Sequence, residues 1–165
     1  MTTITIDPGI KGGIAWHIHN VNEIQAVKMP DTPKGIVDLF KQQNFRNLDP
    51  ICYLEELKGV LPNQSSKATW TFAEHYGTLK GALMALGIPI VYVRAQVWQK
   101  AIGATRPPIP KDASAAVKAR IKAEGKRNIK KIVEARYPDL RVTLATADAL
   151  GILMYADAVE DSKQN

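Results

Sequence analysis

With 165 residues, of which 45% are hydrophobic, the chain is expected to form one domain with a substantial core. Its only cysteine, Cys52, excludes an internal disulfide and favours a reducing setting, either the cytoplasm or an organelle matrix. No apolar run is as long as a membrane span, so no membrane contact is expected, and the net charge of +6 favours an acidic partner.

In chain order, the N-terminal part predicts three strands, a helix and a fourth strand. The strands are short runs rich in β-branched residues, bounded by glycine, proline or asparagine. Proline opens the helix, where it occupies its favoured first-turn position. The expected elements are the strands Thr3–Asp7, Gly13–His19 and Glu23–Lys28, a helix from Pro33 through Phe40, and the strand Ile51–Leu54, which ends at Glu55 and Glu56.

The C-terminal part is mainly helical and carries the positive charge. Residues 1–93 are neutral, whereas residues 94–141 contain thirteen basic and four acidic side chains, and residues 142–165 have a net charge of −3. Apolar residues at helical spacing indicate the helices, and a glycine indicates a break in the basic stretch. The expected elements are the helix Trp70–Leu86, the strand Ile88–Val93, a helical turn at Gln96–Ala101, basic helices at Ala113–Ala123 and Lys126–Tyr137 separated at Glu124-Gly125, a last helix Thr146–Val159, and a frayed tail.

Strand, strand, strand, helix, strand, helix, strand, helix is the order of the ribonuclease H-like α/β fold. We therefore expect a five-stranded mixed sheet flanked by helices, in a single domain over residues 1–160 with a frayed tail over residues 161–165. The concentrated basic segment favours nucleic acid as the partner, although a solvated lysine-rich helix face has the same composition.

Two acidic residues, Asp7 and Glu55, each stand at the C-terminal end of a predicted strand. If these strands are parallel neighbours, both carboxylates lie at the sheet edge where open α/β folds bind ligands. Asp148 begins the last helix, which could deliver it to the same point. Taken singly, each has a simpler interpretation: Asp7 is a turn residue, Glu55 solvates a strand end, and Asp148 caps a helix. Together they favour a site for one or two Mg²⁺ or Mn²⁺ ions, which can activate water and stabilise the leaving oxygen of a phosphodiester.

Several short motifs stand in a fixed order along the chain. They are Asp7-Pro8-Gly9 after a strand, a strand ending in Glu55, Ser66 through Phe72, Tyr76-Gly77, Gly81-Ala82-Leu83, Leu86-Gly87-Ile88-Pro89, Trp98-Gln99-Lys100, a basic helix ending in Tyr137-Pro138, and Ala147-Asp148-Ala149-Leu150. From roughly Ile4 to Ala156, this ordered set resembles the RuvC family of Holliday-junction resolvases, and its middle part resembles the phage and organelle branch.

The resemblance implies a ribonuclease H-like fold, a homodimer, dependence on Mg²⁺ or Mn²⁺, and paired nicks across a four-way DNA junction. It also implies two acids spaced Asp-x-x-Asp, but Ala145 stands where the first of them would be. Residues three apart share a helix face, so an acid there would aim at the same metal as Asp148. Either this branch uses a different fourth ligand, or Ala145 replaces a native aspartate and disables the site. We hypothesise the second.

Basic, hydroxyl and aromatic side chains are the expected DNA contacts. The loop after Glu55 and the start of the next helix would supply phosphate contacts, while the aromatic residues there would stack on unpaired bases or belong to the core. Lys126 or Lys130 would approach the scissile phosphate. The candidates are Lys58, Ser65, Ser66, Lys67, Trp70, Phe72, Gln99, Lys100, Lys126, Arg127, Lys130 and Lys131.

The histidines and the other helix acids have simpler interpretations. His17 and His19 are two apart on a strand and could be a metal pair, but no third ligand is evident. His75 is expected on a helix surface. Asp157 lies more than two turns beyond Asp148, too far to replace the missing acid.

Two rival functions stay open. An actin-like ATPase also places a phosphate loop after an Asp-x-Gly strand end, but it needs a second such loop and a second domain, which this chain does not contain. A non-catalytic junction-binding protein would bind a branched DNA without cutting it, both as this chain and as its Ala145→Asp variant.

Overall fold

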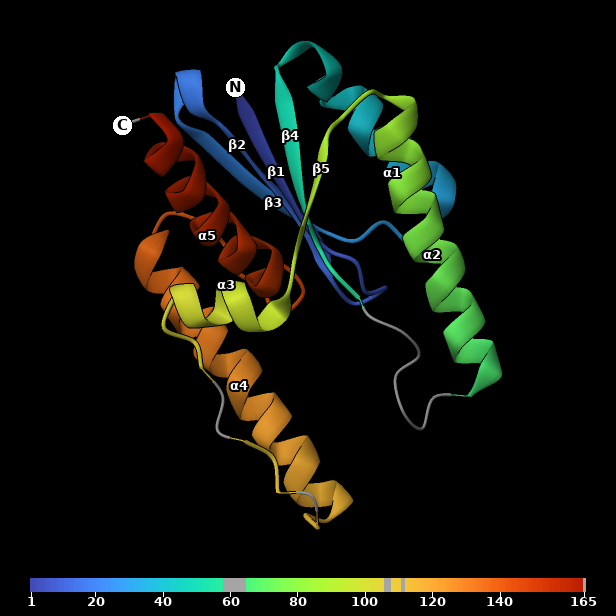
Figure 1. The fold of residues 1–165 in the computed structure, drawn as a ribbon, viewed down its shortest axis with the longest axis vertical. Helices are drawn as coiled ribbons and strands as arrows, with labels where there is room; N and C mark the ends of the chain where they lie inside the picture. Colours follow the sequence, from blue (N-terminus) through green and yellow to red (C-terminus); the bar gives the residue numbers. More distant parts are fainter. Residues whose placement is uncertain (58–64, 106–107, 111, 165) are drawn as a thin grey trace.

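The computed structural model describes residues 1–57, 65–105, 108–110 and 112–164. Its centre is a five-stranded sheet built from β1 (Thr2–Asp7), β2 (Gly13–Ile18), β3 (Glu23–Lys28), β4 (Pro50–Glu55) and β5 (Ile90–Val93). The strands lie in the order β3-β2-β1-β4-β5 (Figure 1). β4 is parallel to β1 and to β5, whereas β2 is antiparallel to β1 and to β3. The sheet is therefore mixed, as the order of predicted elements indicated.

Helices cover both faces of this sheet. One face carries α1 (Pro33–Gln42) and α2 (Ser66–Ala85), and the other carries α3 (Ala95–Ala101), α4 (Ala115–Arg136) and α5 (Ala147–Gln164) (Figure 1). Each face has its own core because alternate strand residues point to opposite sides. On β1, Ile4 and Ile6 pack with the core of the α1 and α2 face, while the Thr5 hydroxyl donates to the Ala149 carbonyl of α5 at 2.7 Å. Among the described helices, none is long and apolar enough to cross a membrane.

Side-chain caps set where three of the helices begin. Thr32, Ser65 and Ser114 each accept a hydrogen bond from a backbone N–H three residues later, at 3.1, 3.2 and 3.3 Å. Because Ser65 caps α2, that helix begins at Ser66, four residues before the predicted start at Trp70. Its end is set by Gly87, which has a left-handed φ of 70° that favours glycine, so β5 starts only at Ile90.

The basic region forms one helix, and the predicted break at Glu124-Gly125 is wrong. α4 runs without interruption for 22 residues, from Ala115 to Arg136. Glycine in a helix interior costs about 1 kcal/mol relative to alanine, which by itself is too little to end a helix whose C-terminal half is held by packing. Ile129 and Val133, which follow the glycine, supply that packing, since both are fully buried in the core shared with α5.

The last helix also extends further than predicted. α5 continues to Gln164, so Glu160–Gln164 is helical and not a frayed tail. Glu160 is buried, accepts a hydrogen bond from the Tyr53 hydroxyl of β4, and pairs with Lys163 at 2.8 Å. These contacts attach the end of α5 to the sheet.

Candidate active site

Asp7 and Glu55 stand at the same end of two neighbouring parallel strands. Ile6 of β1 pairs with Leu54 of β4, so Asp7 and Glu55 are the next residues on each strand. Strand alternation places both on the α5 face, because Thr5 and Tyr53, two residues earlier, also contact α5. Two carboxylates are thereby brought to one edge of the sheet, as expected from the sequence.

α5 adds a third carboxylate, Asp148, in its first turn. The turn before the helix is held by reciprocal hydrogen bonds between two threonines. The Thr143 N–H donates to Thr146 Oγ1 at 3.0 Å, and the Thr146 N–H donates to Thr143 Oγ1 at 3.2 Å. The bond from Thr5 to Ala149 then fixes the start of the helix against β1, next to Asp7.

The electrostatics of Asp7 reflect its burial and the nearby Asp148 carboxylate. Burial, together with the neighbouring Asp148 carboxylate, raises the pKa of Asp7 from 3.8 to about 6. The Gly9 N–H and the Lys126 ammonium group act in the opposite direction. Lys126 Nζ lies 4.0 Å from Asp148 Oδ2, so the α4 lysine is the cation nearest to this pair of acids among the described contacts. Asp7 is thus a carboxylate whose negative charge is only partly compensated.

Two glycines create the space around Asp7. A Cβ atom at Gly12 would lie 2.3 Å from the Asp7 carbonyl oxygen and 2.8 Å from its carboxylate oxygen Oδ2. A Cβ atom at Gly13 would lie 2.7 Å from the carbonyl oxygen of Ala145. The turn after β1 therefore requires glycine at both positions, since any side chain would collide with backbone at the site.

Ala145 lies in the turn before α5, two residues ahead of the first helical residue, and is half-buried. The sequence predicted that Ala145 and Asp148 share a helix face, but only Asp148 is in the helix. The close approach of the Ala145 carbonyl to Gly13 nevertheless places this residue beside the turn that follows Asp7.

The donor set fits a hard divalent cation, because three carboxylates supply the oxygen ligands that Mg²⁺ and Mn²⁺ prefer. A tighter criterion asks for three acidic, histidine or cysteine side chains whose ligand atoms all lie within 4.8 Å of one another. Within the described ranges, the group that meets it is a different one, His17, His19 and Asp157. Asp7, Glu55 and Asp148 are more widely spaced as a set, so one ion in contact with all three would need their side chains to move closer together.

Glu55 also lines an open hollow that contains basic side chains. The hollow has a volume of about 1020 Å³ and is bordered by Arg94 before α3, by Lys100 at the end of α3, and by Tyr155 of α5. Lys100 was a predicted DNA contact. Arg94 was missed as a candidate, although its position directly after a predicted strand at the same sheet edge could have indicated it. Gln99, a neighbouring candidate, is half-buried on α3.

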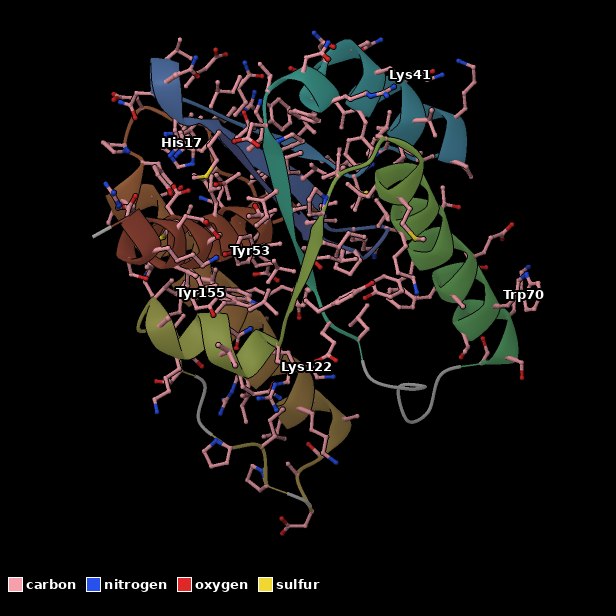
Figure 2. The ribbon with its side chains drawn as sticks, turned by 45° about the horizontal axis from the view of Figure 1, so that its top comes forward. His17, Lys41, Tyr53, Trp70, Lys122 and Tyr155 are labelled. Carbon is pink, nitrogen blue, oxygen red and sulfur yellow. The ribbon has the colours of Figure 1, made fainter. Side chains whose placement is uncertain are left out.

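The candidates near α2 have mixed positions. Lys58 falls outside the described residues. Ser65 caps the helix, and Ser66 and Lys67 are exposed in its first turn. The Trp70 side chain is 74% exposed and points away from the sheet (Figure 2). Phe72 is half-buried and stacks on Tyr76, with ring centroids 6.4 Å apart.

The basic residues of α4 face in different directions. Lys126 reaches the acidic site, while Lys130 forms an ion pair with Glu134 one turn along the same helix. Arg127 and Lys131 line another hollow of about 610 Å³ together with Arg120. Of the two lysines proposed for the scissile phosphate, Lys126 therefore has the position that the role needs.

The structure changes two expectations about the histidines. His17 and His19 do have a third potential metal ligand, Asp157, which lies 140 residues from His17 in the sequence. His75, expected on a helix surface, is half-buried on α2, and both of its ring nitrogens are buried without a hydrogen-bond partner. Burial lowers the pKa of His75 accordingly.

Comparisons with known proteins identify the fold. No protein-family model matches the chain, and the search of curated proteins found no relative. Solved structures do match, among them RuvC of Thermus thermophilus, which is 14% identical with a TM-score of 0.53, over 92% of this chain and 90% of that one. The same protein in complex with a Holliday junction substrate is 13% identical with a TM-score of 0.55 and the same coverage.

The resemblance to the phage and organelle branch, the homodimer and the roles of the individual site residues stay predictions. The matches cover nearly the whole chain and share its mixed sheet flanked by helices. The protein therefore has the ribonuclease H-like fold found in RuvC.

Proposed function

We propose that this protein is a structure-selective endonuclease that binds four-way and related branched DNA as a homodimer and hydrolyses phosphodiesters with Mg²⁺ or Mn²⁺. The observation that carries the proposal is the gathering of Asp7, Glu55 and Asp148 on one face at one end of the sheet. The similarity of the fold to a RuvC structure that contains a Holliday junction substrate supports branched DNA as the ligand.

The residues of the site would have separate roles in binding the ions and in stabilising the phosphate. Asp7, Glu55 and Asp148 would hold the ions, which when bound would supply activated water and stabilise the leaving oxygen. Asp7 is preorganised for this role by the Gly9 N–H, which donates to its carboxylate, and by the absence of a side chain at Gly12. Lys126 supplies a positive charge beside Asp148, where it can contact a phosphate oxygen as charge develops.

Electrostatic attraction to DNA would come from the basic side chains around this edge. Arg94 and Lys100 border the hollow that includes Glu55, and α4 carries further basic residues past the end of the sheet (Figure 1). These groups offset the repulsion between the carboxylates and the phosphate backbone. The exposed Trp70 is available for stacking on an unpaired base, a contact worth about 1–3 kcal/mol.

Cleavage of a synthetic four-way junction, by this chain and by its Ala145→Asp variant, tests the proposal. We expect weak cutting by this chain and a gain of at least about tenfold by the variant, because an added carboxylate beside Asp7 and Asp148 strengthens ion binding. Asp7→Asn in the Ala145→Asp background is the control and should abolish cutting. If no form cuts the junction with either Mg²⁺ or Mn²⁺, the proposed nuclease activity is refuted.

A non-catalytic junction-binding protein is the second candidate, favoured by the alanine at position 145. It predicts tight, salt-sensitive binding of the junction by both forms without any cleavage. A gel-shift measurement on the same samples separates this outcome from a protein that neither binds nor cuts.

A further inference from the structure

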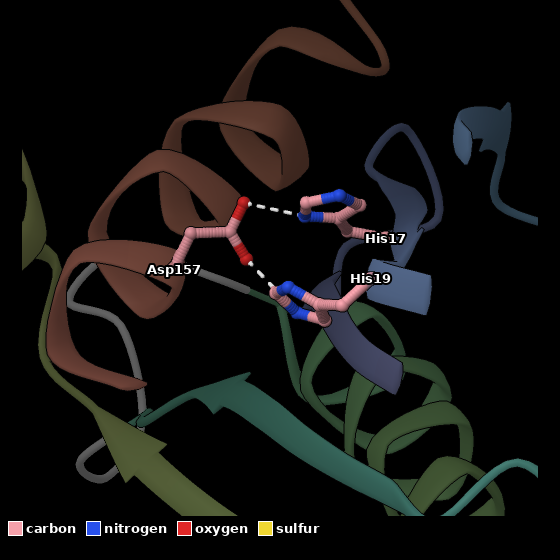
Figure 3. A group of neighbouring side chains, drawn as sticks. All are labelled: His17, His19 and Asp157. Carbon is pink, nitrogen blue, oxygen red and sulfur yellow. Dashed lines mark hydrogen bonds and ion pairs between the residues drawn. The ribbon is translucent and has the colours of Figure 1, made fainter. Parts of the chain in front are cut away.

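A second group of potential metal ligands lies at the opposite end of the sheet from Asp7. His17 at the end of β2 and His19 in the following turn face Asp157 of α5 (Figure 3). His17 Nδ1 lies 3.0 Å from Asp157 Oδ2, and His19 Nε2 lies 3.6 Å from Asp157 Oδ1. The two imidazole rings are 4.0 Å apart between centroids. Three side chains, from β2, the turn after it and α5, thus converge on one point.

The spacing of these atoms suits ligands of one metal ion. A tetrahedral ion with ligands at about 2.0–2.1 Å keeps neighbouring ligand atoms about 3.3–3.4 Å apart. The two observed separations involve different oxygens of Asp157, but one ligand atom from each of the three side chains lies within 4.8 Å of the others, so modest side-chain rotations bring them to that spacing. A distance of 3.6 Å is too long for a hydrogen bond, and Asp157 Oδ1 is buried with no hydrogen-bond partner. A buried carboxylate oxygen without a donor is costly, and a cation between it and the imidazole nitrogens removes that cost.

We propose that His17, His19 and Asp157 bind a divalent transition-metal ion, with Zn²⁺ as the ion that two imidazoles and a carboxylate favour. This donor set differs from the all-oxygen set of the acidic site, where Mg²⁺ or Mn²⁺ is expected. The side chains are 13–21% exposed, so the site is reached from solvent and leaves a fourth position for water. The three ligands together with water complete a four-coordinate site.

One neighbouring group competes with the ion. The Thr3 hydroxyl lies 2.8 Å from His19 Nε2, the same nitrogen that faces Asp157. A neutral imidazole nitrogen has one lone pair, so an ion can bind His19 Nε2 only if the hydrogen bond from Thr3 to that nitrogen is broken. Asp161, which also influences the charge state of His19 and Asp157, adds a further negative charge nearby that attracts a cation.

The site is separate from the proposed nuclease site. His17 pairs with Thr3 of β1, four residues before Asp7, which corresponds to about 13 Å along the strand. Asp157 lies nine residues beyond Asp148, or about 13.5 Å along α5. An ion here would join β2 to α5 and would play no direct part in phosphodiester chemistry.

Titration of untagged, metal-free protein with Zn²⁺, in competition with a chromophoric chelator, tests the site. We expect one equivalent to bind tightly in the presence of excess Mg²⁺, and the thermal midpoint of unfolding to rise with Zn²⁺ concentration. Asp157→Asn and His17→Gln should each lower the Zn²⁺ affinity by at least about tenfold. Asp7→Asn should leave it unchanged, which separates this site from the acidic one.

Two controls keep the result interpretable. His75→Gln, at a half-buried histidine outside the cluster, should retain Zn²⁺ binding, and circular dichroism in EDTA checks that each variant is folded. Co²⁺ added to the unmutated protein should give the strong visible absorption of a four-coordinate site. Absence of that absorption, or equal Zn²⁺ affinity in all forms, would show that the cluster is only a hydrogen-bonded contact between β2 and α5.

Discussion

Asp7 has a nearly buried carboxylate next to the Asp148 carboxylate, and this makes the stability of the metal-free protein depend on pH. Its pKa in the folded protein, about 6, is above the ordinary value of 3.8. The folded state therefore binds a proton that the unfolded state releases, and the free energy of unfolding falls as the pH rises from about 4 to about 6. Above that range Asp7 is ionised in the folded protein, and the free energy of unfolding is lowered by the full cost of burying its charge.

We predict that Asp7→Asn stabilises the metal-free protein at pH 7. The expected gain is about 1–2 kcal/mol, because the neutral amide avoids the cost of burying a charge, removes the repulsion from Asp148 and retains an acceptor for the Gly9 N–H. Urea unfolding in EDTA from pH 4 to pH 8 measures this and should show a flatter profile for the variant. Mg²⁺ should then stabilise the unmutated chain and have little effect on Asp7→Asn. A variant less stable than the parent throughout this range would contradict the assignment.

Short-range patterns carried most of the information about individual sites. Asp7, Glu55 and Asp148 could be predicted because strand ends and a helix start are local features, and parallel neighbours bring such ends together. The group of His17, His19 and Asp157 could not, since Asp157 lies 140 residues after His17 and meets the histidines only after α5 packs on the sheet. Likewise, only the packing of α4 shows that Lys126, and not Lys130, faces the acids.

The helices illustrate how packing overrides local preference. All five strands were predicted to within two residues at each end, because β-branched runs bounded by turns leave few alternatives. The break expected in the basic region did not occur, because the glycine penalty is smaller than the stabilisation from the buried side of α4. The end of α5 was also mispredicted, since it is held by Tyr53, a residue distant in the sequence.

A proline substitution tests whether α4 is one continuous helix in solution. Gly125→Pro should lower the free energy of unfolding by about 3 kcal/mol, because proline removes a helix hydrogen bond and collides with the preceding turn. Ala115→Pro, at the first helical position after the Ser114 cap, is the matched control and should change stability by less than about 0.5 kcal/mol. Equal effects in chemical denaturation would mean that two helices meet near residue 125.

The distribution of charge over the whole molecule predicts how it approaches DNA. Arg120, Arg127 and Lys131 lie together along one hollow of α4, within the segment that carries the excess positive charge. Lys41 is exposed on α1, on the opposite face of the sheet (Figure 2). Binding governed by phosphate contacts should depend on the first group and not on the second.

We predict that replacing Arg120, Arg127 and Lys131 by glutamine weakens junction binding and reduces its dependence on salt. Each lost phosphate contact lowers the magnitude of the slope of log K against log salt by about 0.9, so a reduction of about 2–3 is expected. Lys41→Gln should leave the slope unchanged. Fluorescence anisotropy with a labelled junction over a range of salt concentrations gives the slopes, and identical values for all forms would exclude α4 as the DNA-binding surface.

α5 links the two ends of the molecule, because it carries Asp148 in its first turn and Asp157 two and a half turns later. A restraint applied at one end of a rigid helix reduces the freedom that must be lost on binding at the other. If an ion joins Asp157 to β2, then the two metal sites are thermodynamically coupled, and each ion raises the affinity for the other by the same factor. Nuclease activity at limiting Mg²⁺ would then depend on the occupancy of a site that never touches DNA.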